Sequence, residues 1–220
     1  MPRRERRSVT GVETLGPYTL VRVSRGSLDT GAPGQFFMLE APGRVLPRPF
    51  SLCFAPRSEL AFLVDPVGPG TQALAGLAPG DRLAVFGPLG RGFRLDVPRP
   101  LLVGGGIGIA PLPFLSEALE QPPAVLGFRT SFHAEAADLV PNAEVVIDPT
   151  FVTDVLPSGR SILACGPEPM LEAVRSLHPD AQLAWEAPMA CGYGACYGCV
   201  VELDGTLKRL CVEGPVLCSS

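Results

Sequence analysis

The pattern of hydrophobic and polar residues changes once along the chain. Up to residue 96, short runs rich in β-branched and aromatic residues are separated by Gly- and Pro-containing turns at fairly regular spacing. This pattern is typical of a small antiparallel barrel or sandwich. The expected strands cover 9–13, 18–23, 35–39, 60–64 and 82–86, and the only expected helix covers 71–77.

A second pattern begins after Val97-Pro98-Arg99-Pro100, where two X-Pro pairs hold the chain extended. Fully apolar runs then alternate with helix-like segments, which predicts a parallel sheet covered by helices. The expected strands cover 101–103, 125–128, 144–147 and 161–164, and the expected helices cover 113–119 and 168–177.

The last 35 residues are rich in Cys and Gly and too short for a core of their own, so we expect them to wrap a metal centre. The predicted fold class is therefore β followed by α/β. It consists of an antiparallel β-barrel domain over 1–97, a parallel-sheet α/β domain over 98–185 and a small C-terminal extension over 186–220.

Composition excludes several classes of protein. The chain has 220 residues, of which 46% are hydrophobic and 18% charged, which excludes intrinsic disorder. A net charge of −4 gives no general case for nucleic-acid binding. No run reaches 18 apolar residues, so no membrane span is expected. The basic start lacks the apolar stretch of a signal peptide, so we expect a cytoplasmic protein.

The seven cysteines carry the strongest chemical signal. Their odd number, without a secretory signal, argues against a disulfide framework. Four of them follow the spacing C-x4-C-x2-C-x11-C, and the first three are spaced as in plant-type ferredoxins, where thiolates hold a [2Fe–2S] cluster. Interspersed glycines permit the tight loop that this needs. The expected ligands are Cys191, Cys196, Cys199 and Cys211.

Two alternatives to this ligand set stay open. One is a structural zinc site, although such sites usually combine two C-x2-C pairs. The other uses Cys218 as the fourth ligand. We expect Cys218 to be a free thiol, because the hairpin from Cys199 to Cys211 closes more economically.

Two loops in the second domain are candidates for nucleotide binding. Gly104-Gly105-Gly106-Ile107-Gly108-Ile109-Ala110-Pro111 lies between an apolar strand and a helix-like run. Glycines there let the phosphates of a dinucleotide approach the backbone, although a tight strand–helix turn would look similar. Cys165-Gly166-Pro167 follows another apolar strand, at the sheet edge where open parallel sheets bind ligands.

The barrel carries a third pair of motifs. Arg48-Pro49-Phe50-Ser51 offers a guanidinium and a hydroxyl, and Val67-Gly68-Pro69-Gly70-Thr71 offers glycine amides at a possible helix start. Both suit a pyrophosphate, although each by itself is more typical of an ordinary turn than of a binding site.

Taken in this order and spacing, the motifs resemble those of the ferredoxin–NADP reductase superfamily, over nearly the whole chain. That superfamily combines an antiparallel flavin-binding barrel with a nicotinamide-nucleotide-binding α/β domain. The cysteine motif on a short C-terminal extension is similar to that of the electron-transfer subunits of class 1B dihydroorotate dehydrogenases.

The resemblance implies three sets of residues. A [2Fe–2S] cluster would be held by the four cysteines already named. Cys165 would lie near the nicotinamide as the candidate catalytic residue. FAD would be bound by Arg48, Pro49, Phe50, Ser51, Leu63, Val64, Asp65, Gly70 and Thr71, and the nicotinamide nucleotide by Gly105, Gly106, Ile107, Gly108, Ala110 and Gly166. NAD is expected from the family, while Arg129 leaves NADP open.

The implied function is an electron relay. Dihydroorotate would be oxidised at an FMN on a separate catalytic subunit, and electrons would pass through the [2Fe–2S] cluster and FAD to NAD+ for pyrimidine biosynthesis. The expected assembly contains two copies of each chain. Alternatives are the reductase subunit of a sulfide dehydrogenase-, transhydrogenase- or hydrogenase-type complex, or a non-enzymatic iron–sulfur module.

Overall fold

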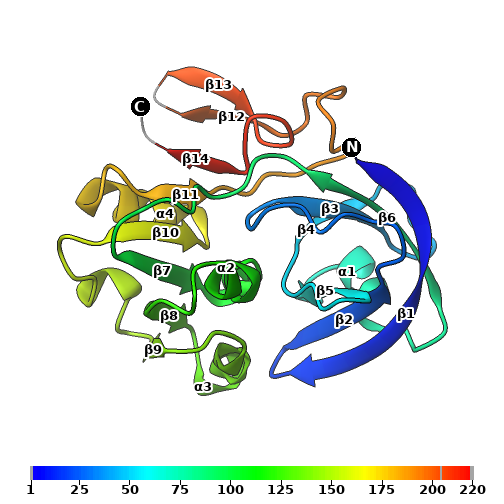
Figure 1. The fold of residues 1–220 in the computed structure, drawn as a ribbon, viewed down its shortest axis with the longest axis horizontal. Coiled ribbons are helices and arrows are strands. Elements are labelled where there is room, and N and C mark those ends of the chain that lie inside the picture. Colours follow the sequence, from blue (N-terminus) through cyan, green and yellow to red (C-terminus); the bar gives the residue numbers. More distant parts are fainter. Residues whose placement is uncertain (1, 204, 219–220) are drawn as a thin grey trace.

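The first part of the chain is a curled antiparallel sheet. A computed structural model describes residues 2–203 and 205–218. Six strands follow the order β4-β3-β6-β1-β2-β5, and a bridge between Phe54 and Ala61 joins the chain after β4 to β5, so that the two sheet edges meet (Figure 1). The strands are β1 (Arg3–Leu15), β2 (Tyr18–Ser24), β3 (Phe36–Glu40), β4 (Arg48–Ser51), β5 (Glu59–Val64) and β6 (Arg82–Leu89).

Side chains alternate between the two faces of these strands, and those on the inner face fill the barrel interior. Phe37 and Phe62 are fully buried and meet edge to face, with their ring centroids 5.6 Å apart. β4 was not expected from the sequence, because it is short and contains Pro49. It lies at the end of the sheet order, where a residue without a backbone N–H is tolerated. Among the described residues of this part, α1 (Pro69–Ala75) is the one α-helix, and it begins two residues before the expected start.

The second part is a mixed six-stranded sheet in the order β14-β11-β10-β7-β8-β9. Five strands are parallel: β7 (Pro100–Gly105), β8 (Ala124–Phe128), β9 (Ala143–Ile147), β10 (Ser161–Cys165) and β11 (Gln182–Ala184). The helices are α2 (Leu112–Ala118), α3 (Ser131–Ala134) and α4 (Glu168–Leu177), with 3-10 turns at Gly106–Ile109, Glu135–Leu139 and Val152–Asp154. The expected helix over 168–177 is present with the expected bounds.

The C-terminal extension is attached to this sheet. β12 (Val200–Leu203) and β13 (Thr206–Arg209) form a hairpin, and β14 (Val216–Cys218) pairs with β11 in antiparallel fashion. Cys199, Leu210 and Cys211 share one hydrophobic cluster with Leu183 and Leu171 of the α/β part. The extension therefore takes its apolar support from the neighbouring sheet.

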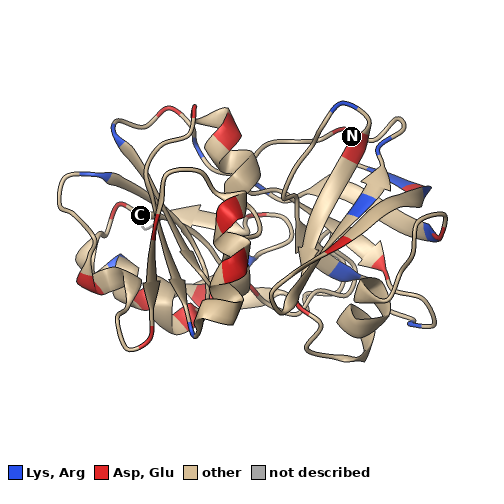
Figure 2. Ribbon diagram, turned by 90° about the horizontal axis from the view of Figure 1, so that it is seen from below, with Lys and Arg blue, Asp and Glu red and all other residues tan. Residues whose placement is uncertain are grey.

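The two large parts share a core as well. Tyr18, Leu20 and Leu63 of the barrel belong to the same buried cluster as Leu102 and Leu126 of the α/β sheet. Charge is divided unevenly: residues 1–97 contain 12 arginines and 8 acidic residues, whereas residues 98–220 contain 6 basic and 14 acidic residues (Figure 2). Among the described residues, no helix is long and apolar enough to cross a membrane.

Candidate functional site

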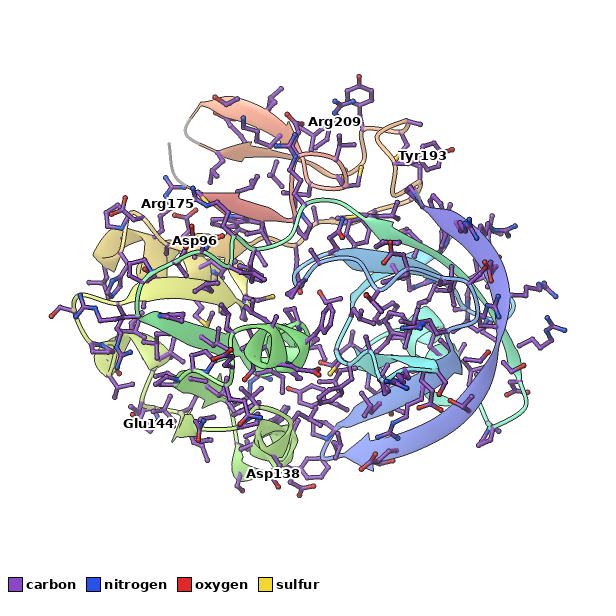
Figure 3. All side chains as sticks on the ribbon, viewed as in Figure 1. Asp96, Asp138, Glu144, Arg175, Tyr193 and Arg209 are labelled. Carbon is purple, nitrogen blue, oxygen red and sulfur yellow. The ribbon has the colours of Figure 1, made fainter. Side chains whose placement is uncertain are left out.

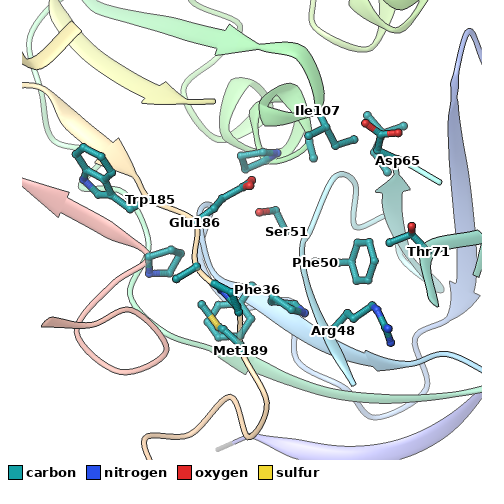
Figure 4. A pocket seen from close by; sticks show the side chains of 17 residues that line it. Phe36, Arg48, Phe50, Ser51, Asp65, Thr71, Ile107, Trp185, Glu186 and Met189 are labelled. Carbon is teal, nitrogen blue, oxygen red and sulfur yellow. The ribbon is translucent and has the colours of Figure 1, made fainter. Parts of the chain in front are cut away.

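A cavity of about 500 Å³ lies where the barrel, the α/β sheet and the extension meet (Figure 4). Its walls are aromatic and aliphatic, with a few polar groups, as is usual for a cofactor site. Nine of the residues predicted for the two nucleotides line it: Arg48, Pro49, Phe50, Ser51, Leu63, Asp65, Thr71, Ile107 and Ala110. Residues far apart in the sequence are thereby brought to one site.

Two other residues predicted for FAD do not line this cavity. Val64 is fully buried in the barrel core, because its side chain points to the opposite face of β5 from those of Leu63 and Asp65. Gly70 acts through its lack of a side chain: a Cβ there would lie 2.0 Å from the guanidinium carbon of Arg48. Glycine at this position lets the Arg48 guanidinium lie against the start of α1.

Hydrogen bonds define the state of the nearby polar groups. The Thr71 hydroxyl accepts from the Gly68 N–H at 3.0 Å and lies 3.1 Å from the Gly68 carbonyl, to which it donates, so it stabilises the start of α1. The Arg48 guanidinium donates to the Leu46 carbonyl at 3.1 Å. The guanidinium is thus held beside the cavity rather than extended into solvent.

Eight residues of the cavity wall were not predicted from the sequence. The segment between β11 and the first cysteine contributes five consecutive residues, and three more come from β3, the glycine loop and the approach to β14. They are Trp185, Glu186, Ala187, Pro188 and Met189, with Phe36, Pro111 and Pro215. No local pattern marks them, because only the return of β14 to the sheet fixes the path of this linker.

Two carboxyl groups face the cavity with perturbed acidity. Burial among protein atoms raises the pKa of Glu186, although its side chain remains accessible from the open cavity. Burial also raises the pKa of Asp65, and the nearby His133 partly opposes this effect. Figure 4 shows the Glu186 carboxylate and the Ser51 hydroxyl on facing sides of the cavity. Glu186 and Ser51 therefore add a polar pair to the charged and polar groups of Arg48, Asp65 and Thr71 in the mostly apolar wall.

A second cavity, of about 450 Å³, lies at the carboxyl ends of the parallel strands β7 and β8. Gly105 and Gly106 line it together with Phe128 and Arg129. Gly106 has a φ of +55°, and a Cβ there would meet one atom within 4 Å, the Tyr18 hydroxyl at 3.8 Å. This is the edge of the sheet where open α/β folds bind nucleotides.

The other predicted glycines serve loop packing. A Cβ on Gly108 would lie 2.4 Å from the Gly166 Cα, and a Cβ on Gly166 would lie 2.4 Å from the Met170 side chain. These glycines let the two loops approach each other closely.

Cys165, predicted beside the nicotinamide, is 3% exposed and lines neither cavity. Burial and the charge of Glu186 raise its pKa, so the thiol stays protonated.

Four of the five cysteines of the extension, those predicted as cluster ligands, meet in two pairs. The Cys199 and Cys211 sulfurs are 3.2 Å apart, and the Cys211 N–H points at the Cys199 sulfur at 3.5 Å. In the other pair, the Cys191 sulfur accepts from the N–H groups of Ala195 at 3.3 Å and Cys196 at 3.4 Å. Backbone amides thus point at the sulfurs, which stabilises thiolates.

The acidity of the thiols reflects these contacts. Desolvation would raise the pKa of Cys191, but hydrogen bonds from Tyr193, Cys196 and Ala195 outweigh it and lower the pKa to about 6. Burial and the adjacent Cys199 raise the pKa of Cys211 to about 12, and the charge of Cys191 contributes to this rise. Each of the four thiols therefore affects, or is affected by, the pKa of another, so all four lie in one small region.

The paired arrangement fits a two-iron centre better than a single metal ion. In the described part of the chain, no three His, Cys, Asp or Glu side chains surround one point that would hold a single ion. A tetrahedral zinc site needs four donors around such a point, whereas a [2Fe–2S] centre takes two thiolates on each iron. Cys218 lies on β14 opposite Gln182, outside both pairs.

The surface of the cysteine loop exposes two aromatic rings. Tyr193 is 62% exposed and rests edge-on against Phe86, and Tyr197 is 63% exposed with the Arg209 guanidinium 5.3 Å from its ring centre. Tyr193 and Arg209 stand on the outer side of the extension (Figure 3). Both rings are thus available beside the cysteines.

Comparison with known proteins agrees with this geometry. Residues 186–219 match the model of the iron–sulfur cluster binding domain of dihydroorotate dehydrogenase B. Two solved structures share the fold. A chain from an NADH-dependent reduced ferredoxin–NADP oxidoreductase has a TM-score of 0.83 and 24% identity, covering 96% of this chain and 87% of its own length. Phthalate dioxygenase reductase has a TM-score of 0.65 and 16% identity, covering 90% and 85%.

Curated relatives span nearly the same length as this chain. The dihydroorotate dehydrogenase B (NAD+) electron transfer subunit of Clostridium perfringens is 33% identical, over 91% of this chain and 89% of its own. The protein of the same name from Geobacillus thermodenitrificans is 36% identical, over 97% and 96%. This chain belongs to the family of electron transfer subunits of dihydroorotate dehydrogenase B.

Proposed function

We propose that this chain carries electrons from dihydroorotate, oxidised on a separate FMN-containing subunit, through a [2Fe–2S] cluster and FAD to NAD+. The observation that supports the proposal is that a single chain contains three sites. They are the 500 Å³ cavity between the barrel, the sheet and the extension, the 450 Å³ cavity at the ends of β7 and β8, and the paired cysteines. A bound flavin can exchange hydride with NAD and single electrons with an iron–sulfur centre, which is the chemistry that such a relay requires.

The residues present suit these groups. Phe36, Phe50 and Met189 would cover the flavin ring, while Ser51 and Glu186 offer polar groups to its edge. The Arg48 guanidinium is placed for a charge-assisted bond to a phosphate. We assign the cluster to Cys191, Cys196, Cys199 and Cys211, and the nicotinamide nucleotide to the cavity that Gly105 and Gly106 line.

The extension connects the proposed centres. Met189 lines the flavin cavity only two residues before Cys191. Gly192 packs on β3, since a Cβ there would lie 2.7 Å from the Met38 side chain. β3 also carries Phe36 of the cavity wall. We therefore divide the chain functionally into a flavin unit over 1–97, a nucleotide unit over 98–185 and a cluster unit over 186–220.

The partner follows from the same chemistry. Relatives named as electron transfer subunits require a catalytic subunit. The carboxylates that line the two described cavities are Asp65, Glu186 and Asp148, and we place them beside the flavin and the nicotinamide nucleotide, so we assign the oxidation of dihydroorotate to that other subunit. We propose an FMN-containing partner and an assembly of two copies of each chain.

Reconstitution tests the proposal. Protein purified without oxygen should contain FAD and about two irons and two acid-labile sulfides per chain. Alone it should oxidise NADH with an artificial acceptor and form no orotate. Addition of the FMN subunit should yield dihydroorotate oxidation linked to NAD+. Orotate formation by the isolated chain, or iron without sulfide, would contradict it.

A further inference from the structure

A buried tyrosine stands between the two cavities. Tyr18, at the start of β2, is 2% exposed, and its ring meets that of His133 edge-on with the centroids 6.0 Å apart. Its hydroxyl lies 3.8 Å from the position that a Cβ would take on Gly106. Gly106 lines the nucleotide cavity and the next residue, Ile107, lines the flavin cavity. The hydroxyl therefore adjoins the loop segment that separates the two.

This hydroxyl makes no hydrogen bond within the described part of the chain, and it is not among the fully enclosed polar atoms that lack a partner. A hydroxyl that keeps some access while the rest of its ring is buried can bond to a ligand in place of water. Burial raises the pKa of Tyr18 to about 12, the charge of Asp65 adds to this, and Arg129 opposes it. The group stays protonated near neutral pH and is available as a donor.

The surroundings favour an anionic or oxygen-rich ligand. Arg129 lies close enough to Tyr18 to oppose the rise in its pKa. His133 acts in the same way on the pKa of Asp65. The His133 Nδ1 is taken by the Thr130 hydroxyl at 2.8 Å, which fixes the ring beside Tyr18. The barrel also holds the segment that carries His133, because the Gly16 N–H donates to the Glu135 carboxylate at 3.1 Å.

We infer that the Tyr18 hydroxyl binds the ribose–pyrophosphate link of the nicotinamide nucleotide, where the dinucleotide crosses from the adenosine cavity to the flavin cavity. The inference rests on the proposed function, since only a molecule that occupies both cavities must pass this point. It adds a barrel residue to a binding site that sequence motifs place wholly in the α/β domain.

The test compares Tyr18→Phe with wild type as purified holoprotein, using calorimetric titration with NAD+ and with AMP. Loss of one hydrogen bond should weaken NAD+ binding about three- to tenfold, leaving AMP binding, FAD content and Tm unchanged. The KM for NADH should rise by the same factor with little change in kcat. Ser58→Ala, which removes an exposed hydroxyl from the turn before β5, is the control and should bind NAD+ as wild type does.

The outcomes separate the two proposals. If wild type fails to bind NAD+, the proposed function is wrong. If wild type binds NAD+ and Tyr18→Phe binds it equally well, this inference alone is overturned. A lower Tm, loss of FAD or equal weakening of AMP would also overturn it, because each indicates a structural role of the hydroxyl.

Discussion

At the scale of single residues, the cysteines make the sharpest prediction. Cys196→Ser should abolish the visible absorbance of the cluster, because Cys196 belongs to one of the two sulfur pairs. Cys218→Ser should leave the absorbance intact, because Cys218 pairs with Gln182 in the sheet. Anaerobic absorbance spectra with iron and sulfide analysis measure both. Bleaching by loss of Cys218 but not of Cys211 would refute the ligand assignment.

Arg48 and Gly70 lie together beside the cavity that we propose for the flavin. Arg48→Ala should weaken FAD binding roughly ten- to a hundredfold, because a charge-assisted bond contributes about 1.5–3 kcal/mol. Gly70→Ala should act in the same direction, since its Cβ would overlap the guanidinium. Gly68→Ala is a matched control, as its Cβ would meet no atom within 4 Å. FAD retention after gel filtration reports the result, and unchanged retention in Arg48→Ala would remove this residue from the site.

Glu186 makes a prediction about pH. Its pKa in the folded chain is raised by burial, so folding favours the protonated form. Stability should therefore fall as pH rises from the ordinary carboxyl range through the raised pKa. Glu186→Gln should match wild type at low pH and exceed it in Tm at neutral pH. Thermal unfolding from about pH 4.5 to about pH 8 measures this difference, and parallel curves would contradict it.

At the scale of elements, the glycine loop after β7 depends on close packing. Gly108→Ala would place a Cβ within 2.6 Å of the Cys165 and Gly166 backbone, so it should destabilise the chain by about 1–3 kcal/mol. Gly11→Ala in β1, whose Cβ would meet Arg22 at an ordinary 3.7 Å, should change stability little. Urea unfolding of both variants checks this. Equal stability of Gly108→Ala and wild type would show that the loops can separate.

At the scale of the whole molecule, we predict that the exposed tyrosines of the cysteine loop, Tyr193 and Tyr197, contact the proposed catalytic subunit. Aromatic residues at interface centres often contribute about 2 kcal/mol or more, so Tyr193→Asp or Tyr197→Asp should weaken the complex roughly thirtyfold. NADH oxidation with an artificial dye should be spared. Leu177→Asp, at the exposed end of α4, is the control. Equal loss of dye reduction and coupled activity would count against this contact.

The sequence by itself determined the chemistry of this protein and the class of its fold. The cysteine spacing, the glycine loops and Arg48–Ser51 are local features, since each needs only a few neighbouring residues to be recognised. Strand alternation and the apolar runs predicted a β-barrel followed by an α/β domain for the same reason, and the structure confirms that order.

Only the tertiary structure decided which residues share a cavity. Glu186 and Met189 reach the flavin cavity because β14 returns to pair with β11, a contact that no local pattern encodes. The side chains of Val64 and Cys165 are buried and line neither cavity, because strand pleating and loop packing set their directions. In the sequence Tyr18 is an ordinary strand residue, and only the packing of the barrel against the α/β sheet places it between the two domains. Long-range packing creates these neighbours, so the order of residues along the chain does not reveal them.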